Sequence, residues 1–320
     1  MADRVRLMVA GAGAFGSEHL RTLATMKGVD IAGIADVNAA AAESACRRHG
    51  AARWGTDAIA LFEALRPDGL IVATPGSSHF ALATHALALH IAVLVEKPVA
   101  VTAAQSRGIA EAEARSGAFV LPGHILRFSE PYRQFVELAG SKAVGTILSV
   151  TARRHRDEDH ASRYSDDPVL MTMIHDIDLA LWITGAGVTD VCALRQPADT
   201  PRSETIMLAR GSNGAAWQLS AAWIFPAQSS PPDRIEVIGE NGSVELEAGN
   251  AIQCYGHSPL RIDISGAEPG QALRAELNHF VSCIRERRKP DVVTLGDATA
   301  GLAIADAVIA ALNSGGMVKT

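Results

Sequence analysis

The segment PVLMTMIHDIDLALW, residues 168–182, places His175, Asp176 and Asp178 in an otherwise apolar stretch. Burying a charge costs free energy unless the charge is paired or used. An imidazole titrates near neutral pH, so His175 is a candidate general acid or base. Asp178 would share the helix face of His175 and could orient its ring, whereas Asp176 points about 100° away. An ion pair is an equally good explanation for Asp178.

A lysine at a strand end is the second candidate for chemistry. The apolar run IAVLV ends in Glu96, Lys97 and Pro98. If this run is a strand of a parallel sheet, Lys97 lies at the carboxyl edge, where open α/β folds bind their ligands. There an ammonium group could stabilise a developing negative charge. A solvated lysine without a function is the simpler alternative.

A glycine motif follows the first apolar run, VRLMVA, and precedes a helical pattern. Its residues are Gly11, Ala12, Gly13, Ala14, Phe15 and Gly16. In this strand, turn and helix context, GxGxxG predicts a dinucleotide site, with the pyrophosphate at the helix N-terminus. Asp36 ends the second apolar run and would accept hydrogen bonds from a ribose diol. Its carboxylate would repel a 2′-phosphate, so NAD is favoured and NADP is the alternative.

The elements that must position these residues fall into two parts. Up to residue 121, short apolar runs alternate with helical stretches, which predicts a doubly wound parallel Rossmann sheet. From residue 122 to 320, runs with period-two alternation and turn signals between them predict strands, and two helical patterns close the chain. The Asn-Gly pair at 241–242 predicts a hairpin. The domain boundary is therefore expected at residue 121, with a dinucleotide-binding domain at residues 1–121 and a second domain at residues 122–320.

Four stretches together resemble the glucose-fructose oxidoreductase, inositol dehydrogenase and MocA (Gfo/Idh/MocA) family. They are GAGAFGSEH with His19, ATPGSSHF at 73–80, the EKP at 96–98, and HDIDLALW at 175–182. The resemblance covers nearly the whole chain. It implies that residues 122–320 form an α+β domain with a large open, mostly antiparallel sheet, which serves substrate binding and oligomerisation. It also implies a substrate that lies between that domain and the nicotinamide.

The resemblance also implies roles for individual residues. Lys97 would hydrogen-bond the reacting oxygen, and His175 would be the acid or base. On the cofactor side, it implies Ala73, Thr74 and Pro75 along the cleft, His79 nearby, and Glu96 beside the nicotinamide. On the substrate side, the candidates are Arg127, Arg153, Arg154, Tyr164 and Asp178. If two of the arginines face the cleft, the substrate could be anionic, because arginine favours carboxylates.

The chain departs from the family pattern at two positions. Met171 stands where the family usually has an Asp four residues before the histidine, and TPGSSH lacks the Asn that many members have after the proline. The missing carboxylate would have contacted the imidazole, and Thr172 or Asp178 is placed to replace it. Two alternatives follow: a catalytically impaired NAD(H)-binding sensor or scaffold, and an enzyme that uses NAD transiently, for instance in glycoside cleavage.

The composition argues against several other functional classes of protein. The net charge of -6 gives no reason to expect nucleic-acid binding. The four cysteines form no CxxC pair, and the run RRHRDEDH at 153–160 has no distinctive ligand spacing, so no metal is expected. Apolar runs are too short for a signal peptide or membrane span, which predicts a cytoplasmic protein. An open sheet face carrying Trp217 and Trp223 would need a cover, which predicts a homodimer or homotetramer.

Taken together, the residues and the resemblance predict an NAD(P)-dependent oxidoreductase. It would transfer hydride between the nicotinamide and a hydroxyl or ketone carbon of a sugar, a polyol or a related carbohydrate derivative.

Overall fold

The structure is a computed structural model that describes residues 4–163, 166–257, 259–268 and 270–320. Contacts divide the chain into two compact units. The first unit contains residues 1–125 and 270–299, and the second contains residues 126–269 and 300–320. The segment 270–299 thus packs with the N-terminal part of the chain, although it lies within the predicted second domain, residues 122–320.

The first unit is built on a six-stranded sheet in which every described pair of neighbours is parallel, in the order β3-β2-β1-β4-β5-β6. Its interior strands are almost continuously buried, as expected of a parallel sheet covered on both faces. This confirms the predicted Rossmann sheet. The strands are β1 (Val5–Ala10), β2 (Val29–Ala35), β3 (Trp54–Gly55), β4 (Gly69–Val72), β5 (Ala92–Glu96) and β6 (Val120–Gly123).

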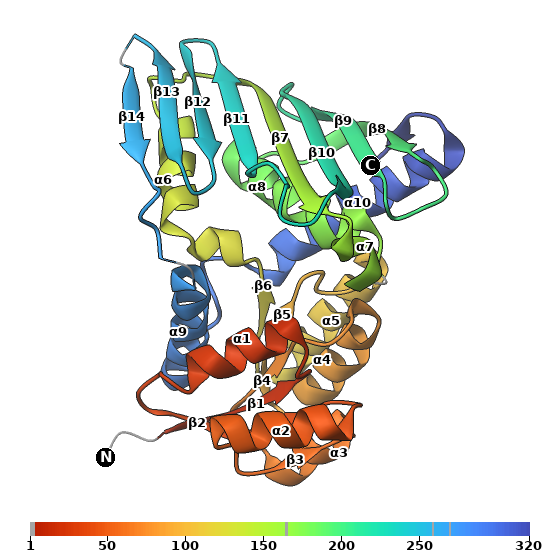
Figure 1. Cartoon of the computed structure of the whole chain (residues 1–320), viewed down its shortest axis with the longest axis vertical. Helices are drawn as coiled ribbons and strands as arrows, with labels where there is room; N and C mark the ends of the chain where they lie inside the picture. The colour runs from red at the N-terminus through yellow and green to blue at the C-terminus, as the bar shows by residue number, and fades with distance from the viewer. Residues whose placement is uncertain (1–3, 164–165, 258, 269) are drawn as a thin grey trace. The chain divides into compact units, whose positions relative to one another are not determined.

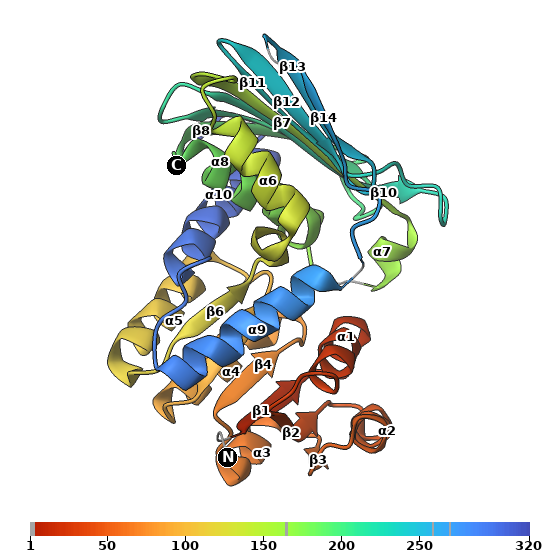
Figure 2. The same ribbon diagram turned by 90° about the vertical axis from the view of Figure 1, so that its left-hand side faces the viewer.

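Crossover helices connect these strands, and Asn38, Asp57 and Thr102 cap three of them with side-chain oxygens. A further helix, α9 (Gln271–Glu286), returns from the C-terminal part of the chain to cover β4 and β6 (Figure 2). Phe280 of α9 meets Phe119 edge to face, with ring centroids 5.8 Å apart. The crossover helices are α1 (Ala14–Leu23), α2 (Ala39–His49), α3 (Ala58–Leu65), α4 (His79–Ala88) and α5 (Ala103–Ser116).

The second unit is built on a nine-stranded sheet in the order β14-β13-β12-β11-β7-β10-β9-β8-β15 (Figure 1). Only β7 and β10 pair in parallel among the described strands, which confirms the mostly antiparallel sheet. β11 and β12 form the hairpin predicted at 241–242. The strands are β7 (Ile147–Asp157), β8 (Val188–Gln196), β9 (Glu204–Gly211), β10 (Ala216–Phe225), β11 (Arg234–Gly239), β12 (Gly242–Glu247), β13 (Ala251–Gly256), β14 (Leu260–Asp263) and β15 (Val318–Lys319).

Helices pack on one face of this sheet and leave the other bare over the described residues (Figure 2). The bare face exposes Leu194, Ile206, Leu208 and Ile238. The helical segments of this part of the chain are η2 (Ile125–Phe128), α6 (Glu130–Ala139), α7 (Asp159–Arg163), the π-helical turn η3 (Val169–Met173), α8 (Ile174–Thr184) and α10 (Leu295–Ser314).

The expectation that Trp217 and Trp223 need a partner to cover them is wrong. Their exposed fractions are 1% and 0%, because both side chains point to the helical face of the sheet. There Trp223 Nε1 donates a 2.8 Å hydrogen bond to Thr172 Oγ1 of η3. The tryptophans of β10 therefore lie on the face of the sheet that the helices cover. Smaller aliphatic side chains lie on the opposite, bare face.

Helix α10 is long and apolar enough to cross a membrane by length and composition alone. Half of its apolar window is buried inside the protein. The buried core helix of a globular protein passes the same test, so α10 is weak evidence for a membrane span.

Candidate active site

The glycine loop of the first unit has the geometry that a dinucleotide requires. Gly11 has a φ of +99°, and a Cβ there would overlap the carbonyl oxygen of Ala73. A Cβ at Gly16 would overlap the carbonyl oxygen of Gly11. At Gly13, the N-cap residue of α1, a Cβ would meet no atom within 4 Å. The loop is therefore closed toward the protein and open at Gly13, where a pyrophosphate could reach the N-terminus of α1.

Asp36 lies at the end of β2, next to this loop. Its Oδ2 accepts a 2.7 Å hydrogen bond from the Ala12 N–H, and its Oδ1 accepts a 2.8 Å bond from the Asn38 N–H. Both bonds fix the carboxylate and leave lone pairs for further donors, such as a ribose diol. The neighbouring Val37 is 92% exposed and carries no charge. The residues at this position fit NAD, because the Asp36 carboxylate has acceptor capacity left for a ribose diol and neither Val37 nor Asn38 beside it is a cation.

The segment after β4 joins the same edge of the sheet. Ala73 continues the ladder through its N–H to the carbonyl of Ala10, and Thr74 Oγ1 lies 2.6 Å from Ser78 Oγ. His79 is 1% exposed, and its Nε2 and Nδ1 lie 2.8 Å from the carbonyl oxygens of Thr74 and Pro98. His79 therefore ties the turn after β4 to the turn after β5. Pro75 is exposed at the edge.

Lys97 follows β5 and is half-buried, whereas Glu96 is 6% exposed. Glu96 Oε1 accepts a 2.7 Å bond from His19 Nε2 of α1, and Oε2 accepts a 3.3 Å bond from the Lys97 N–H. His19 in turn meets the ring of Phe15 edge to face at 5.3 Å. Contacts thus run from the glycine loop through His19 and Glu96 to the backbone of Lys97.

In the second unit, His175 is half-buried in the first turn of α8. The predicted single helix over 168–184 is instead a π-helical turn followed by an α-helix, because the Ile174 N–H donates to the carbonyl of Val169. A π-helical turn holds more residues than an α-helical one, so Met171 and His175 are not related by ordinary i, i+4 geometry. Thr172, which was expected to replace the missing Asp, bonds Trp223 instead.

Two buried ion pairs flank His175 along the chain. Asp178 receives bonds from Arg127 Nε and Nη2, the latter 2.8 Å long, and Asp176 receives a 2.8 Å bond from Arg154 Nη2. Arg127 also lies over the ring of Trp182, 5.4 Å from its centroid. Both aspartates are 2% exposed. Bidentate arginine bonds are directional, so they restrict rotation and sliding of α8.

Arg154 is the centre of a larger charge network. It also contacts Asp233, which precedes β11 and receives a 2.6 Å bond from Arg156. Burial raises the pKa of Asp176 despite the charge of Arg154. At Asp233, burial alone would raise the pKa, but Arg154 and the hydrogen bonds of Arg156 outweigh it and lower the pKa. Burial raises the pKa of Tyr132, which lies near the same arginine.

The expected substrate residues are thus distributed over several environments. Arg127, Arg154 and Asp178 are buried in ion pairs. Arg153 is exposed and precedes the inward-facing Arg154 on β7, so its side chain points to the opposite, bare face of the sheet. Tyr164 lies outside the described residues.

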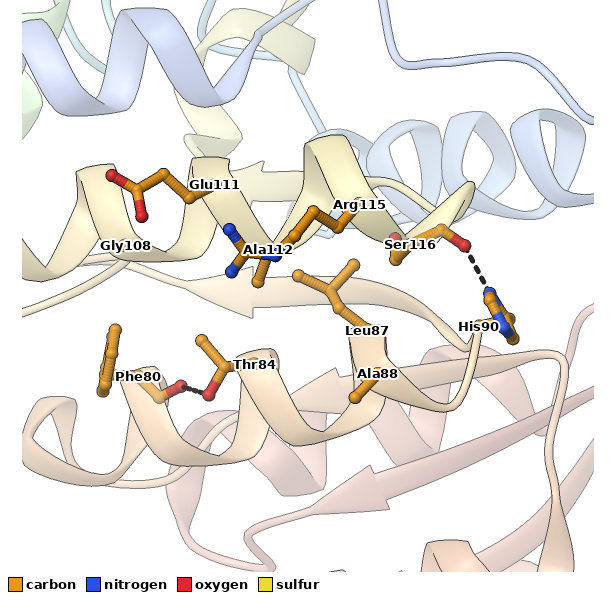
Figure 3. Close-up of a pocket in the computed structure, with 10 residues that line it drawn as sticks. All are labelled: Phe80, Thr84, Leu87, Ala88, His90, Gly108, Glu111, Ala112, Arg115 and Ser116. Carbon is orange, nitrogen blue, oxygen red and sulfur yellow. Dashed lines mark hydrogen bonds between the residues drawn. The ribbon is translucent and has the colours of Figure 1, made fainter.

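A separate groove of about 450 Å³ lies between α4 and α5 (Figure 3). Phe80, Leu87 and Gly108 line it, with Glu111 and Arg115 above them. None of the residues expected to bind cofactor or substrate lines this groove. It is therefore not the site described above.

Two buried polar residues of the first unit, His19 and Glu276, were not predicted as part of the site. His19 was noted only as part of a motif, although its ring binds Glu96 directly. Glu276 of α9 was not noted at all, although it is fully buried. The available signal was the polar residue inside the apolar helical pattern of Leu273, Leu277 and Phe280.

Known proteins match both parts of the chain. Residues 5–124 match the oxidoreductase family with the NAD-binding Rossmann fold, and residues 132–245 match the GFO/IDH/MocA C-terminal domain. Among curated proteins, scyllo-inositol 2-dehydrogenase (NAD(+)) of Bacillus subtilis is 26% identical over 330 residues, covering 98% of this chain and 95% of its own. Inositol 2-dehydrogenase 2 of Paenarthrobacter aurescens is 26% identical over 327 residues, covering 98% and 97%.

Solved structures show the same fold. Myo-inositol 2-dehydrogenase from Lactobacillus plantarum has a TM-score of 0.86 at 20% identity and covers 99% of both chains. GenD2 from gentamicin A biosynthesis, solved in complex with NAD, has a TM-score of 0.85 at 22% identity, covering 100% of this chain and 97% of its own. With its glycine cradle, its Asp36 and both domain matches, the chain belongs to the GFO/IDH/MocA family of oxidoreductases and carries its NAD-binding Rossmann domain.

Proposed function

We propose that the protein is an NAD-dependent dehydrogenase that transfers hydride between the nicotinamide and a CH–OH carbon of a polyol, with inositols as the first substrates to test. The observation that carries this proposal is the cradle open at Gly13, with Asp36 and the Lys97 turn on the same edge of one sheet. Support also comes from the inositol dehydrogenases that match along almost the whole chain.

The first unit would supply cofactor binding and a positive charge. Gly11, Gly13, Ala14, Phe15 and Gly16 would hold the pyrophosphate, Asp36 the ribose, and Ala73, Thr74, Pro75, His79 and Glu96 would shape the nicotinamide side. When bound, NAD accepts or donates the hydride at its nicotinamide ring. Lys97 would hydrogen-bond the substrate oxygen and stabilise negative charge as the oxygen loses its proton.

The second unit would supply the acid or base. His175 would take the hydroxyl proton during oxidation and return it during reduction. The ion pairs of Asp176 and Asp178 would hold α8 and so orient the imidazole, which is the role that we propose for Arg127 and Arg154 in place of substrate contact.

The same ion pairs favour a neutral substrate over an anionic one. Arg127 is bound to Asp178, and Arg154 is shared by Asp176 and Asp233, so neither arginine offers an uncompensated charge to a carboxylate. A polyol needs hydrogen-bonding partners instead of a compensating charge. This agrees with polyols as the substrate class.

NADH absorbance during incubation of the purified protein with NAD and a panel of inositols and sugars tests the proposal. Lys97→Met should abolish turnover while NAD still binds with wild-type affinity. His175→Ala should lower kcat by about 10²- to 10⁴-fold, as expected for loss of a general base. Wild-type turnover in His175→Ala would assign the proton to another group. NAD binding without turnover of any substrate would support the sensor or scaffold, and product formation without net NADH would support transient use of NAD.

Cofactor choice can be tested separately. Asp36→Ser combined with Val37→Arg should weaken NAD binding and strengthen NADP binding, because a repelling carboxylate is removed and a partner for the phosphate is added. Titration of both cofactors against wild type and variant measures the change. NADP binding to the wild type as tightly as NAD would contradict the role of Asp36.

We also propose that the bare face of the nine-stranded sheet binds a second copy of the chain. Three of its exposed aliphatic side chains, Leu194, Ile206 and Leu208, lie on the neighbouring strands β8 and β9 and form a surface that water solvates poorly, and Ile238 lies on β11 of the same face. Sedimentation at micromolar concentration should give a dimer or tetramer. Leu194→Glu with Leu208→Glu should shift the mass toward the monomer, and a monomeric wild type would overturn the assignment.

A further inference from the structure

Helix α9 buries a carboxyl group against the sheet of the first unit. Its inward face carries Leu273, Glu276, Leu277 and Phe280, and Glu276 has no exposed surface. This helix packs against α1 and β1 and covers β4 and β6 (Figure 2). A leucine at position 276 would continue the apolar pattern of this face. Burying a carboxyl group there costs free energy, and packing alone does not explain why it is present.

Both oxygens of Glu276 lack a hydrogen-bond partner. The only other buried side-chain atom in the described part of the first unit without a partner is Nδ1 of His19. His19 binds Glu96, and Glu96 is the charged group that acts on Glu276. The unsatisfied buried polar atoms in the described part of this unit thus lie on α9 and on α1, which pack against each other, and His19 of α1 binds Glu96 directly before Lys97. We call Glu276, His19 and Glu96 the cluster.

The titratable groups beside the cluster include the buried His124, which directly follows Gly123 of β6. A Cβ at Gly123 of β6 would lie 3.0 Å from Glu96 Oε2, so this glycine makes the room for the Glu96 carboxylate. Strands β4 and β6 contribute no titratable side chain, and β5 contributes only Glu96. On α1, Glu18 and Arg21 form an exposed ion pair, and Arg6 of β1 is exposed.

Two carboxylates cannot both keep a negative charge in such a place. Burial, together with the charge of Glu96, raises the pKa of Glu276 well above its usual value. Glu96 accepts hydrogen bonds from His19 and from the Lys97 N–H, whereas Glu276 receives none. A charge on Glu276 would be buried without compensation, so we assign a proton to this carboxyl group.

We propose that Glu276 is a further positioning residue of the active site, a carboxylic acid that stays protonated and orders the Glu96–His19 pair behind Lys97. The proposal rests on the proposed function, because it assigns the purpose of this order to the lysine. A buried acid that costs stability is retained where function uses it. Glu276 touches neither substrate nor the reacting atoms, and it acts through Glu96.

Protonation and positioning are tested with three variants. Glu276→Leu removes the acid, Glu276→Gln keeps a neutral donor of the same shape, and Glu286→Gln is the control at an exposed position of the same helix. Infrared spectra at neutral pH should show a carboxylic-acid band in the wild type and the control. Both Glu276 variants should lack it. A band that persists in Glu276→Gln would overturn the assignment of the proton.

The sign of the stability change follows from the raised pKa. The unfolded chain ionises Glu276 at its ordinary pKa and the folded chain does not, so folding is penalised increasingly as pH rises from that value. Replacing Glu276 by Leu should raise Tm by a few degrees at pH 8, and the gain should shrink toward pH 5. A gain that does not depend on pH would contradict a titrating Glu276.

Turnover tests the positioning role. Glu276→Leu should lower kcat about tenfold with little change in the KM for NAD, because Lys97 is displaced while the glycine loop is intact. Glu276→Gln should restore most of kcat, and the control should match the wild type. Wild-type kcat in Glu276→Leu would overturn positioning. If Lys97→Met stays active, the proposed function fails, but the infrared and stability results still decide where the proton lies.

Discussion

Helix α8 of the second unit and helix α9 of the first bury carboxyl groups in opposite ways. On α8, Asp176 and Asp178 are each matched by an arginine that reaches them with more than one nitrogen. On α9, Glu276 is equally buried but receives no hydrogen bond. On α8, the arginines compensate the charge of the aspartates and fix the position of the helix. On α9, the proton that we assign to Glu276 removes the charge.

The difference predicts opposite responses to mutation. A paired carboxylate leaves an uncompensated arginine when it is lost, so its removal destabilises the protein. Removing an acid that has no hydrogen-bond partner leaves no other group without a partner. Its removal therefore stabilises the protein at pH values above the ordinary pKa of glutamate.

The largest effect is expected at the Arg127–Asp178 pair. Arg127→Met should lower the free energy of unfolding by about 3–5 kcal/mol, because it leaves Asp178 buried without its cation. Adding Asp178→Leu should recover much of that loss. Urea unfolding of both variants measures the difference. A loss below about 1 kcal/mol would mean that α8 is held by packing alone.

A smaller effect with a defined pH dependence is expected at Asp233. Its pKa is lowered in the folded protein, so its contribution to stability is present above the ordinary pKa of aspartate and is lost as pH falls through the lowered value. Asp233→Asn should cost about 1.5–3 kcal/mol at pH 7, the range for hydrogen bonds to charged groups. The difference in the free energy of unfolding between variant and wild type should disappear at acid pH. An equal difference at every pH would contradict an ionic contribution.

The hydrogen bond between Thr172 and Trp223 should contribute less. Thr172→Val keeps the shape of the side chain but leaves the buried indole N–H without its acceptor, which costs about 1–3 kcal/mol. Because η3 precedes His175, the variant should also change kcat more than the KM for NAD. Thermal unfolding and steady-state kinetics give the two values. Unchanged values in both would show that η3 does not depend on this bond.

The smallest effect is expected at an exposed pair. Glu43 and Arg47 lie one turn apart on α2, 2.9 Å from each other, with most of the arginine side chain in water. Glu43→Ala should change the free energy of unfolding by no more than about 0.5 kcal/mol, and less at high salt. A larger loss would show that exposed pairs also hold this fold, which would weaken the contrast drawn between α8 and α9.

Local sequence determined the parts of this protein that depend on neighbouring residues. The strand, glycine turn and helix at residues 5–23 predicted the cradle, and Asp36 followed at the end of the next strand. A glycine at a positive φ and an apolar run buried on both faces are properties of a short segment, so they can be recognised without knowing what lies around it.

Tertiary structure decided which polar residues meet. Arg127 and Asp178 are 51 residues apart, and His19 and Glu96 are 77 apart. Glu276 joins the first unit only because α9 returns to cover its sheet. Trp217 and Trp223 face inward because η3 and α8 lie against β10. The sequence of the strand alone does not show which of its two faces the helices cover. Burial and ion pairing depend on which distant segment packs against a helix or strand. The local sequence pattern does not identify that segment.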